Sequence, residues 1–274
     1  MADTPDHTLL LRTFADEQVN LALELFLRMI TGELGIDLVS VILYGSITFG
    51  DLAPGYGDLD FLAVVRGEPS EDRCRRLIEL RRPLRSGEHG IIATMIEGPF
   101  MPRAMLPAAG PGRAVWWGTS GERTWNRNEL GVVVLYVIRE HGIVIWGEDL
   151  RAEIPEYSPA EVFADLRHGV RMMQGIPWEP DVHAVEGLFL SARTLLWLRE
   201  GRTSGKSEAA AWAAENAAGR WRDLLPRAID IRRNPELAER ADVKAWLAEL
   251  AGPTREALAE ADAALAARLA EPSP

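Results

Sequence analysis

Residues 43–60 read Leu-Tyr-Gly-Ser-Ile-Thr-Phe-Gly-Asp-Leu-Ala-Pro-Gly-Tyr-Gly-Asp-Leu-Asp, and this stretch decides the fold. The apolar, β-branched run 38–44 before it is typical of a buried strand that ends at Gly45-Ser46. The turn residues of 50–57 separate it from a second strand over 58–65. Because side chains alternate along a strand, Asp58 and Asp60 are expected on one face of the sheet.

Two neighbouring carboxylates at the start of a strand indicate a site for a divalent cation. Like charges held together are costly to desolvate unless a cation lies between them. Mg²⁺ meets this need because it binds one or two carboxylates together with substrate phosphates. The backbone of Gly45 and the hydroxyl of Ser46 have no bulky neighbour, so we expect them to approach a triphosphate closely. The motif predicts phosphoryl chemistry at Asp58 and Asp60.

The pattern around this motif changes character near residue 155. A helix is predicted over 8–33, another over 71–82, a third strand over 90–96, a buried helix over 130–139 and a short strand over 142–146. Beyond Ser158 the sequence is rich in Ala, Leu, Glu and Arg at helical spacing. Helices are predicted at 159–174, 182–200, 207–218, 220–232, 235–250 and 253–270. We therefore expect an α+β fold with a mixed-sheet domain over 1–155 and an all-α helical bundle over 156–274.

Composition excludes several classes of function. The 274 residues carry a formal net charge of −11, which argues against binding to nucleic acid or to an anionic membrane. No apolar run reaches the ~18–20 residues of a membrane span, and the acidic N-terminus does not resemble a signal peptide, so a cytoplasmic protein is expected. The five histidines show no metal-ligand spacing, and Cys74 has no second cysteine to pair with.

The motif resembles the nucleotidyltransferase superfamily that includes DNA polymerase beta, whose signature is Gly-Ser, a spacer and Asp-x-Asp. The longer pattern 43–60, with Phe49-Gly50-Asp51-Leu52 and Pro54, is similar to the aminoglycoside adenylyltransferases that act on streptomycin and spectinomycin. The segments 139–147, 190–194 and 201–213 extend this resemblance into the helical region. It covers residues from about 20 to 235.

The resemblance implies a polymerase beta-like catalytic core with ATP bound in the cleft between the two domains. Asp58 and Asp60 would bind Mg²⁺, and Gly45 and Ser46 the triphosphate. A lysine of the helical domain reaches the phosphates in the family, and Lys206 matches it; only Lys206 and Lys244 are lysines in this chain. Arg193 is the second phosphate ligand by resemblance.

The family also carries a general base, a glutamate at the start of the third strand. Alignment from Pro102 puts Ile91 at that position, so the sequence departs from the pattern here. The nearest acids are Glu88, just before the predicted strand, and Glu97, at its far end. We expect Glu88 to serve as the catalytic base, with Glu97 or no side chain as the alternatives.

The acceptor implied by the resemblance is a cationic aminoglycoside or aminocyclitol, and the acidic chain agrees with a cationic substrate. Residues at the family's drug-contacting positions are Trp116, Trp117, Trp178, Asp181 and Glu186. The predicted function is transfer of AMP from Mg-ATP to a drug hydroxyl with release of pyrophosphate, by a monomer or weak homodimer. Two alternatives stay open. One is a non-catalytic nucleotide- or drug-binding homologue; the other is a nucleotidyltransferase for a different small hydroxylated metabolite.

Overall fold

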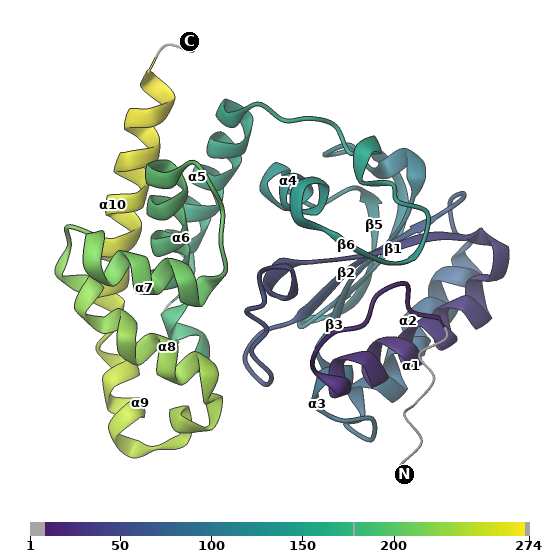
Figure 1. The fold of residues 1–274 in the computed structure, drawn as a ribbon, viewed down its shortest axis with the longest axis horizontal. Coiled ribbons are helices and arrows are strands. Elements are labelled where there is room, and N and C mark those ends of the chain that lie inside the picture. The colour runs from purple at the N-terminus through teal and green to yellow at the C-terminus, as the bar shows by residue number, and fades with distance from the viewer. Residues whose placement is uncertain (1–8, 178, 272–274) are drawn as a thin grey trace. The chain divides into compact units, whose positions relative to one another are not determined.

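The computed structural model describes residues 9–177 and 179–271 and divides the chain into two compact units. Unit 1 comprises residues 1–48 and 57–156, and unit 2 comprises residues 49–56 and 157–274. Unit 1 contains strands and helices, and unit 2 is helical (Figure 1). The predicted α+β fold, a mixed-sheet part followed by a helical part, is confirmed.

Unit 1 is built on a six-stranded mixed sheet with the order β5-β4-β3-β2-β1-β6. Only the β2–β3 pair is parallel, and the other neighbours run antiparallel. All seven residues of β1 are buried, which explains why its sequence is a continuous apolar run rather than an alternating one. The strands are β1 (Leu38–Tyr44), β2 (Leu59–Val65), β3 (Ile96–Pro102), β4 (Pro111–Gly118), β5 (Gly121–Arg127) and β6 (Ile143–Gly147).

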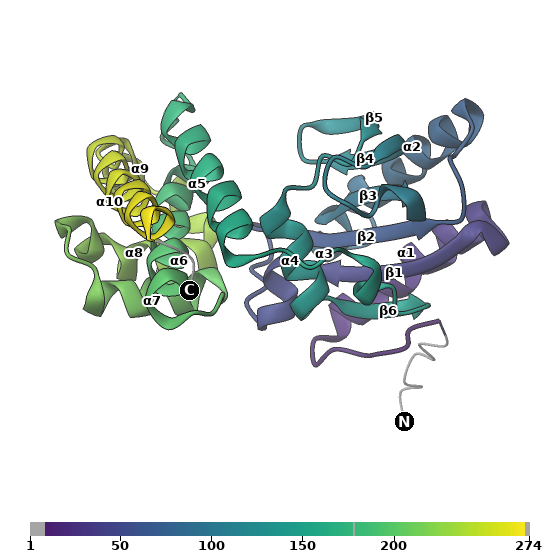
Figure 2. The same ribbon diagram turned by 90° about the horizontal axis from the view of Figure 1, so that it is seen from above.

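The helices of unit 1 cover this sheet, with α1 and α2 on one side and α4 on the other (Figures 1 and 2). Asp16 caps α1 by accepting a hydrogen bond from the Gln18 N–H, and Ser70 caps α2 in the same way through Arg73. A buried aromatic cluster of Phe26, Phe61, Phe100 and Trp117 joins α1 to the sheet. The helices are α1 (Glu17–Leu34), α2 (Glu71–Arg85), α3 (Ile91–Thr94) and α4 (Val132–His141).

The prediction of a strand over 90–96 is wrong. Residues 91–94 form the short helix α3 instead, and the next strand, β3, begins at Ile96. Gly90 has a φ of +86°, a left-handed conformation that turns the chain into α3. The shift matters for the site because it moves Glu97 from the end of a predicted strand to the start of an observed one. The strands β4 and β5 had no counterpart in the sequence prediction.

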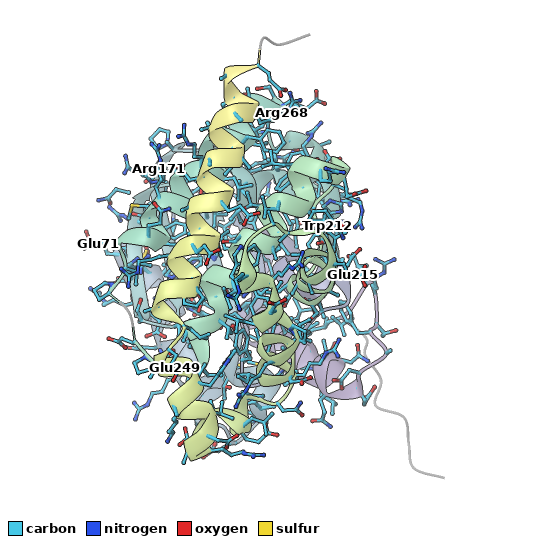
Figure 3. All side chains as sticks on the ribbon, turned by 90° about the vertical axis from the view of Figure 1, so that its left-hand side faces the viewer. Glu71, Arg171, Trp212, Glu215, Glu249 and Arg268 are labelled. Atoms are coloured by element: carbon cyan, nitrogen blue, oxygen red, sulfur yellow. The ribbon has the colours of Figure 1, made fainter. Side chains whose placement is uncertain are left out.

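Unit 2 is a helical bundle in which α10 packs against α5 and α6, and α6 packs against α7. A complete capping box at Ser158 and Glu161 starts α5, as the sequence predicted. Figure 3 shows α10 running along one face of this unit, with exposed Arg268 near one end. The helices are α5 (Pro159–Gly175), α6 (Glu186–Glu200), α7 (Lys206–Asn216), α8 (Leu225–Arg233), α9 (Ala241–Ala248) and α10 (Ala251–Ala270).

Short 3₁₀ turns connect these elements. They are η1 (Gly35–Asp37), η2 (Gly45–Phe49), η3 (Arg103–Met105), η4 (Arg151–Glu153), η5 (Val182–Val185), η6 (Arg220–Leu224) and η7 (Pro235–Glu239). No helix of the described residues is long and apolar enough to cross a membrane.

Residues 49–56, called the spacer from here on, make up most of the segment between the Gly-Ser and Asp-x-Asp halves of the motif. They belong to unit 2, although both flanks of the segment belong to unit 1. Ala53 and Tyr56 are buried in the apolar core of the helical unit, among side chains of α6, α7 and α8. The chain therefore leaves unit 1 after Thr48 and returns to it at Gly57, just before Asp58.

Candidate functional site

Three carboxylates converge at one end of the β2–β3 pair in unit 1. Asp58 directly precedes β2, Asp60 is its second residue, and Glu97 is the second residue of β3. Asp60 and Glu97 are register partners across the parallel pair. Burial, followed by the charges of Asp60, Glu97 and Asp58, raises the pKa of the Tyr44 hydroxyl well above its ordinary value. All three acids therefore act on the same buried point at the end of β1.

The turn after β1 places small residues against these acids. Gly45 has a φ of +71°, and a β-carbon on it would lie 2.0 Å from Oδ2 of Asp60. A glycine is required here because any side chain would displace the Asp60 carboxylate. The Ser46 hydroxyl is buried and has no hydrogen-bond partner among the described residues. Since buried polar groups normally have partners, this hydroxyl is a candidate for contact with a ligand.

Glu97 is held in place by two neighbours on one of its oxygens. The Thr119 hydroxyl donates a hydrogen bond to Oε2 of Glu97 at 2.7 Å, and Nη2 of buried Arg81 lies 3.9 Å from the same atom. Arg81 in turn donates to the carbonyl oxygen of Gly118 at 2.7 Å. The second carboxylate oxygen, Oε1, is thus left to face other groups.

The structure brings Glu97, and not Glu88, to the aspartate pair. Glu88 lies exposed in the turn between α2 and α3. The sequence-based preference for Glu88 followed from placing the third strand over 90–96. With β3 beginning at Ile96, the parallel register puts Glu97 beside Asp60. The signal that would have found it is positional, because both acids are the second residue of neighbouring parallel strands.

The residues at this end of the sheet fit a magnesium ion only together with a bound phosphate. No group of three or more His, Cys, Asp or Glu side chains in residues 9–177 and 179–271 is arranged to hold a metal by itself. Mg²⁺ is usually held by one or two carboxylates plus substrate phosphates and water. The acids would bind the Mg²⁺ ion, and the Ser46 hydroxyl, which has no partner among the described residues, would bind the phosphate.

The tryptophans predicted to contact an acceptor have different surroundings. Trp117 is completely buried, and its indole N–H donates to the carbonyl oxygen of Leu77 at 2.9 Å. We therefore assign it to the core of unit 1 rather than to an acceptor site. Trp116 is half-buried and stacks on Trp125 with 4.8 Å between ring centroids, and its role stays a prediction. Trp178 lies outside the described residues.

In unit 2, Lys206 is the first residue of α7 and forms an ion pair with the first residue of α6. Its Nζ lies 2.8 Å from Oε1 of Glu186 and 5.6 Å from the centre of the Tyr56 ring. Burial of Glu186 opposes its ionisation, but the charge and the hydrogen bond of Lys206 outweigh this and lower the pKa of the carboxyl. Arg193, on the same helix as Glu186, is half-buried, and its predicted phosphate contact is untested.

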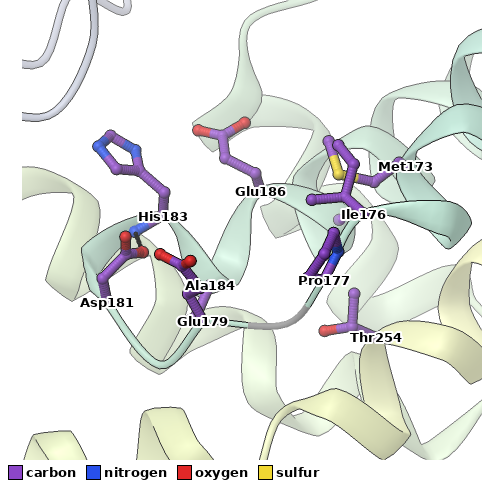
Figure 4. A pocket seen from close by; sticks show the side chains of 10 residues that line it. Met173, Ile176, Pro177, Glu179, Asp181, His183, Ala184, Glu186 and Thr254 are labelled. Carbon is purple, nitrogen blue, oxygen red and sulfur yellow. Dashed lines mark hydrogen bonds between the residues drawn. The ribbon is translucent and has the colours of Figure 1, made fainter. Parts of the chain in front are cut away.

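A pocket of about 460 Å³ opens beside Glu186 within unit 2 (Figure 4). Glu179, Asp181 and Glu186 line it with carboxylates, and an apolar wall completes it. Asp181 also accepts a hydrogen bond from the His183 N–H at 2.8 Å. The structure thus gathers two of the predicted acceptor residues, Asp181 and Glu186, around one cavity. The remaining lining residues are Met173, Ile176, Pro177, His183, Ala184, Gly187 and Thr254.

Two residues near Lys206 were missed by the sequence reasoning. Asp51 of the spacer and Arg232 of α8 form a buried ion pair with 2.9 Å between Oδ1 and Nη1. Arg232 is 2% exposed. Asp51 lies in the quoted motif, but nothing in the sequence indicates its partner, because the two residues meet only through the fold.

Comparison with solved structures finds a protein of similar fold. It is the spectinomycin adenyltransferase AAD(9) from Enterococcus faecialis, solved with ATP and spectinomycin, and the TM-score is 0.65. The identity is 16%, and the match covers 89% of this chain and 98% of that one. No curated protein sequence matches the chain. Residues 166–257 match the family model described as aminoglycoside adenylyltransferase, C-terminal domain. This match lies in the C-terminal part of the chain and agrees with the family resemblance that the sequence indicated.

Proposed function

We propose that the protein transfers AMP from Mg-ATP to a hydroxyl of a cationic aminoglycoside or aminocyclitol and releases pyrophosphate. The observation that carries this proposal is the convergence of Asp58, Asp60 and Glu97 beside the Gly45-Ser46 turn. Two acids suited to magnesium, a third acid beside them, and the Gly-Ser turn that follows β1 are the parts that nucleotidyl transfer requires.

In this proposal each residue has a distinct task. Asp58 and Asp60 would hold Mg²⁺, which would supply positive charge beside the triphosphate. The Ser46 hydroxyl and the backbone of Gly45 orient the triphosphate. The carboxylate of Glu97 accepts the proton of the acceptor hydroxyl as its oxygen bonds to the α-phosphorus and the bond to the leaving pyrophosphate breaks. Lys206 and Arg193 bind the outer phosphates and stabilise the charge that develops on the leaving group.

Glu97 favours the catalytic proposal over a non-catalytic binding homologue. The reason to consider a non-catalytic protein was the apparent lack of a third acid near the aspartate pair. Thr119 and Arg81 contact only Oε2 of Glu97, so Oε1 is available to accept a proton. A third carboxylate beside the aspartate pair therefore supports the catalytic proposal.

The acceptor class is inferred from the pocket of unit 2 and from charge. Three carboxylates and an apolar wall suit a molecule that combines ammonium groups with a saturated ring. The net charge of −11 attracts such cations over a distance. The relative of similar fold was solved with spectinomycin, an observation about that protein which motivates the choice of compounds to test.

The test is pyrophosphate release from Mg-ATP across a panel of aminoglycosides and aminocyclitols, with uncharged polyols as the matched alternative acceptors. We expect release that depends on one or more cationic compounds and on Mg²⁺, and loss of release in the Asp60→Asn variant. Release with uncharged polyols alone would assign a different metabolite as the acceptor. If the protein binds nucleotide but releases no pyrophosphate with any compound, it is a non-catalytic binding homologue.

A further inference from the structure

Asp51 of the spacer caps helix α7, which carries Lys206, the lysine proposed to bind phosphate. Helix α7 begins at Lys206, and its N-cap residue Gly205 has no side chain that could accept a hydrogen bond from the helix. Oδ2 of Asp51 accepts this bond instead, from the Ser207 N–H at 3.0 Å. A residue of the spacer thus supplies, across space, the cap that the sequence of α7 lacks.

The packing at Gly205 leaves room for the Asp51 side chain only because residue 205 is a glycine. A β-carbon on Gly205 would lie 2.8 Å from Cβ and 2.9 Å from Oδ2 of Asp51. The glycine therefore makes room for Asp51 at the N-terminus of α7. Any larger residue would push the Asp51 carboxylate away from the Ser207 N–H.

Arg232 fixes Asp51 in turn. Its guanidinium donates to Oδ1 of Asp51 at 2.9 Å, to the Asp51 backbone oxygen, and to the Ser207 hydroxyl at 3.2 Å. With only 2% of Arg232 exposed, its charge depends on Asp51 for compensation. Two contacts to Asp51 from one rigid guanidinium leave this residue little freedom.

A second spacer residue completes the support of Lys206. The centre of the Tyr56 ring is 5.6 Å from Nζ of Lys206 and 5.7 Å from the guanidinium carbon of Arg232. Tyr56 is 5% exposed, so both contacts lie in a shielded environment. The spacer therefore contacts both the first turn of α7, through the Ser207 N–H, and the side chain of Lys206.

We propose that Asp51 is a positioning residue for Lys206 and that Arg232 keeps Asp51 in the capping position. The inference rests on the proposed role of Lys206 as a phosphate ligand. Asp51 lies in the chain between Ser46 and Asp58, so the segment that joins the two halves of the motif would also position Lys206. Asp51 itself touches no substrate in this scheme.

A double-mutant cycle tests the proposal. The affinity for a non-hydrolysable ATP analogue with Mg²⁺ is measured by calorimetry for the wild type, Asp51→Asn, Lys206→Ala and the double variant. We expect Lys206→Ala to weaken binding roughly tenfold or more, as for a lost charge-assisted contact to phosphate. Asp51→Asn alone should weaken it roughly three- to tenfold, and in the Lys206→Ala background it should add almost nothing.

Two further variants serve as a control and as a replacement for Asp51→Asn. Asp242→Asn removes an exposed carboxylate of unit 2 that pairs with Arg240 and Arg227, and it should leave the affinity unchanged. If Asp51→Asn does not fold, Arg232→Lys keeps the buried charge but loses the fork, and the same cycle is run with it.

The outcomes separate this inference from the proposed function. Additive losses in the cycle would show that Asp51 acts on the fold as a whole, and an unchanged affinity in Asp51→Asn would show that it positions nothing. Either result overturns the inference while the proposed function stands. A wild-type protein that binds no Mg-nucleotide would overturn the proposed function, and the inference with it.

Discussion

The carboxylate of Asp60 occupies the space in which a β-carbon of residue 45 would stand. The ideal Cβ position on Gly45 is 2.0 Å from Oδ2 of Asp60 and 3.0 Å from its Cγ. The end of β1 and the start of β2 can approach this closely only because residue 45 has no side chain. The glycine in the first half of the motif therefore makes room for the Asp60 carboxylate in the second half.

Gly45→Ala should abolish transfer while the protein remains folded. The added methyl displaces the Asp60 carboxylate, and the left-handed backbone adds a strain of about 1–2 kcal/mol. We expect turnover to fall at least ~10²-fold, the scale of losing a principal electrostatic contact. Gly87→Ala is the matched control, because Gly87 has a φ of +82° and nothing within 4 Å of its β-carbon position. Equal activities of the two variants would contradict the close approach at Gly45.

Glu97→Gln should lower the rate of AMP transfer much more than Glu88→Gln does. A positioned general base contributes about 10²–10⁴-fold, and the amide cannot accept the proton. Single-turnover transfer at saturating nucleotide is the measurement, and Mg-ATP affinity should stay close to that of the wild type. The sequence alone favoured the opposite order. A large loss in Glu88→Gln with little effect in Glu97→Gln would restore it.

Asp58→Asn and Asp60→Asn should each remove a negative magnesium ligand with little change in shape. We expect turnover to fall at least ~10²-fold in both variants. Thermal unfolding should show no loss of stability, because relief of repulsion among the three acids offsets lost contacts. Turnover near that of the wild type in either variant would exclude that aspartate from the metal site.

Asp262→Asn should make the stability of unit 2 less dependent on pH. Asp262 of α10 pairs with Arg167 and Arg171 of α5 at 2.7 and 2.9 Å, and Arg171 is labelled in Figure 3. The hydrogen bond from Arg167, with that from Arg171, lowers the pKa of this carboxyl below 3.8 despite partial burial. A lowered pKa contributes stability that is complete well above 3.8 and is lost as the pH falls through the folded-state value.

The size of this effect is modest because solvent screens the pair. About 0.5–1 kcal/mol should separate the wild type from Asp262→Asn at pH 7, and the difference should vanish in strong acid. Urea unfolding followed by helical circular dichroism across pH 2–7 is the measurement. A difference that persists unchanged at pH 2 would mean that Asp262 contributes through packing rather than through its charge.

Much of the site was predictable where it depends on local patterns. The buried run before Gly45-Ser46 and the alternation of Asp58 and Asp60 follow from strand periodicity, which neighbouring residues determine. The capping box at Ser158 is local in the same way. The family resemblance rested on the motif 43–60 and on the segments 139–147, 190–194 and 201–213, and the match of residues 166–257 agrees with it.

The third acid required the tertiary structure. Glu97 could be recognised only after α3 had displaced the predicted strand and the parallel pairing of β2 with β3 had set its register against Asp60. A shift of one residue in register sends a side chain to the other face, and register depends on packing across the sheet rather than on local preference.

The sequence by itself determined the kinds of residues available to this protein: two acids after a Gly-Ser turn, few lysines, and an excess of negative charge. Only the tertiary structure decided that Asp51 caps the helix of Lys206, that Arg232 supports it, and that Trp117 belongs to a core. The physical reason is distance along the chain. Local preferences act over a few residues, whereas a buried arginine on α8 finds its partner in the spacer only when the whole helical unit has assembled around both.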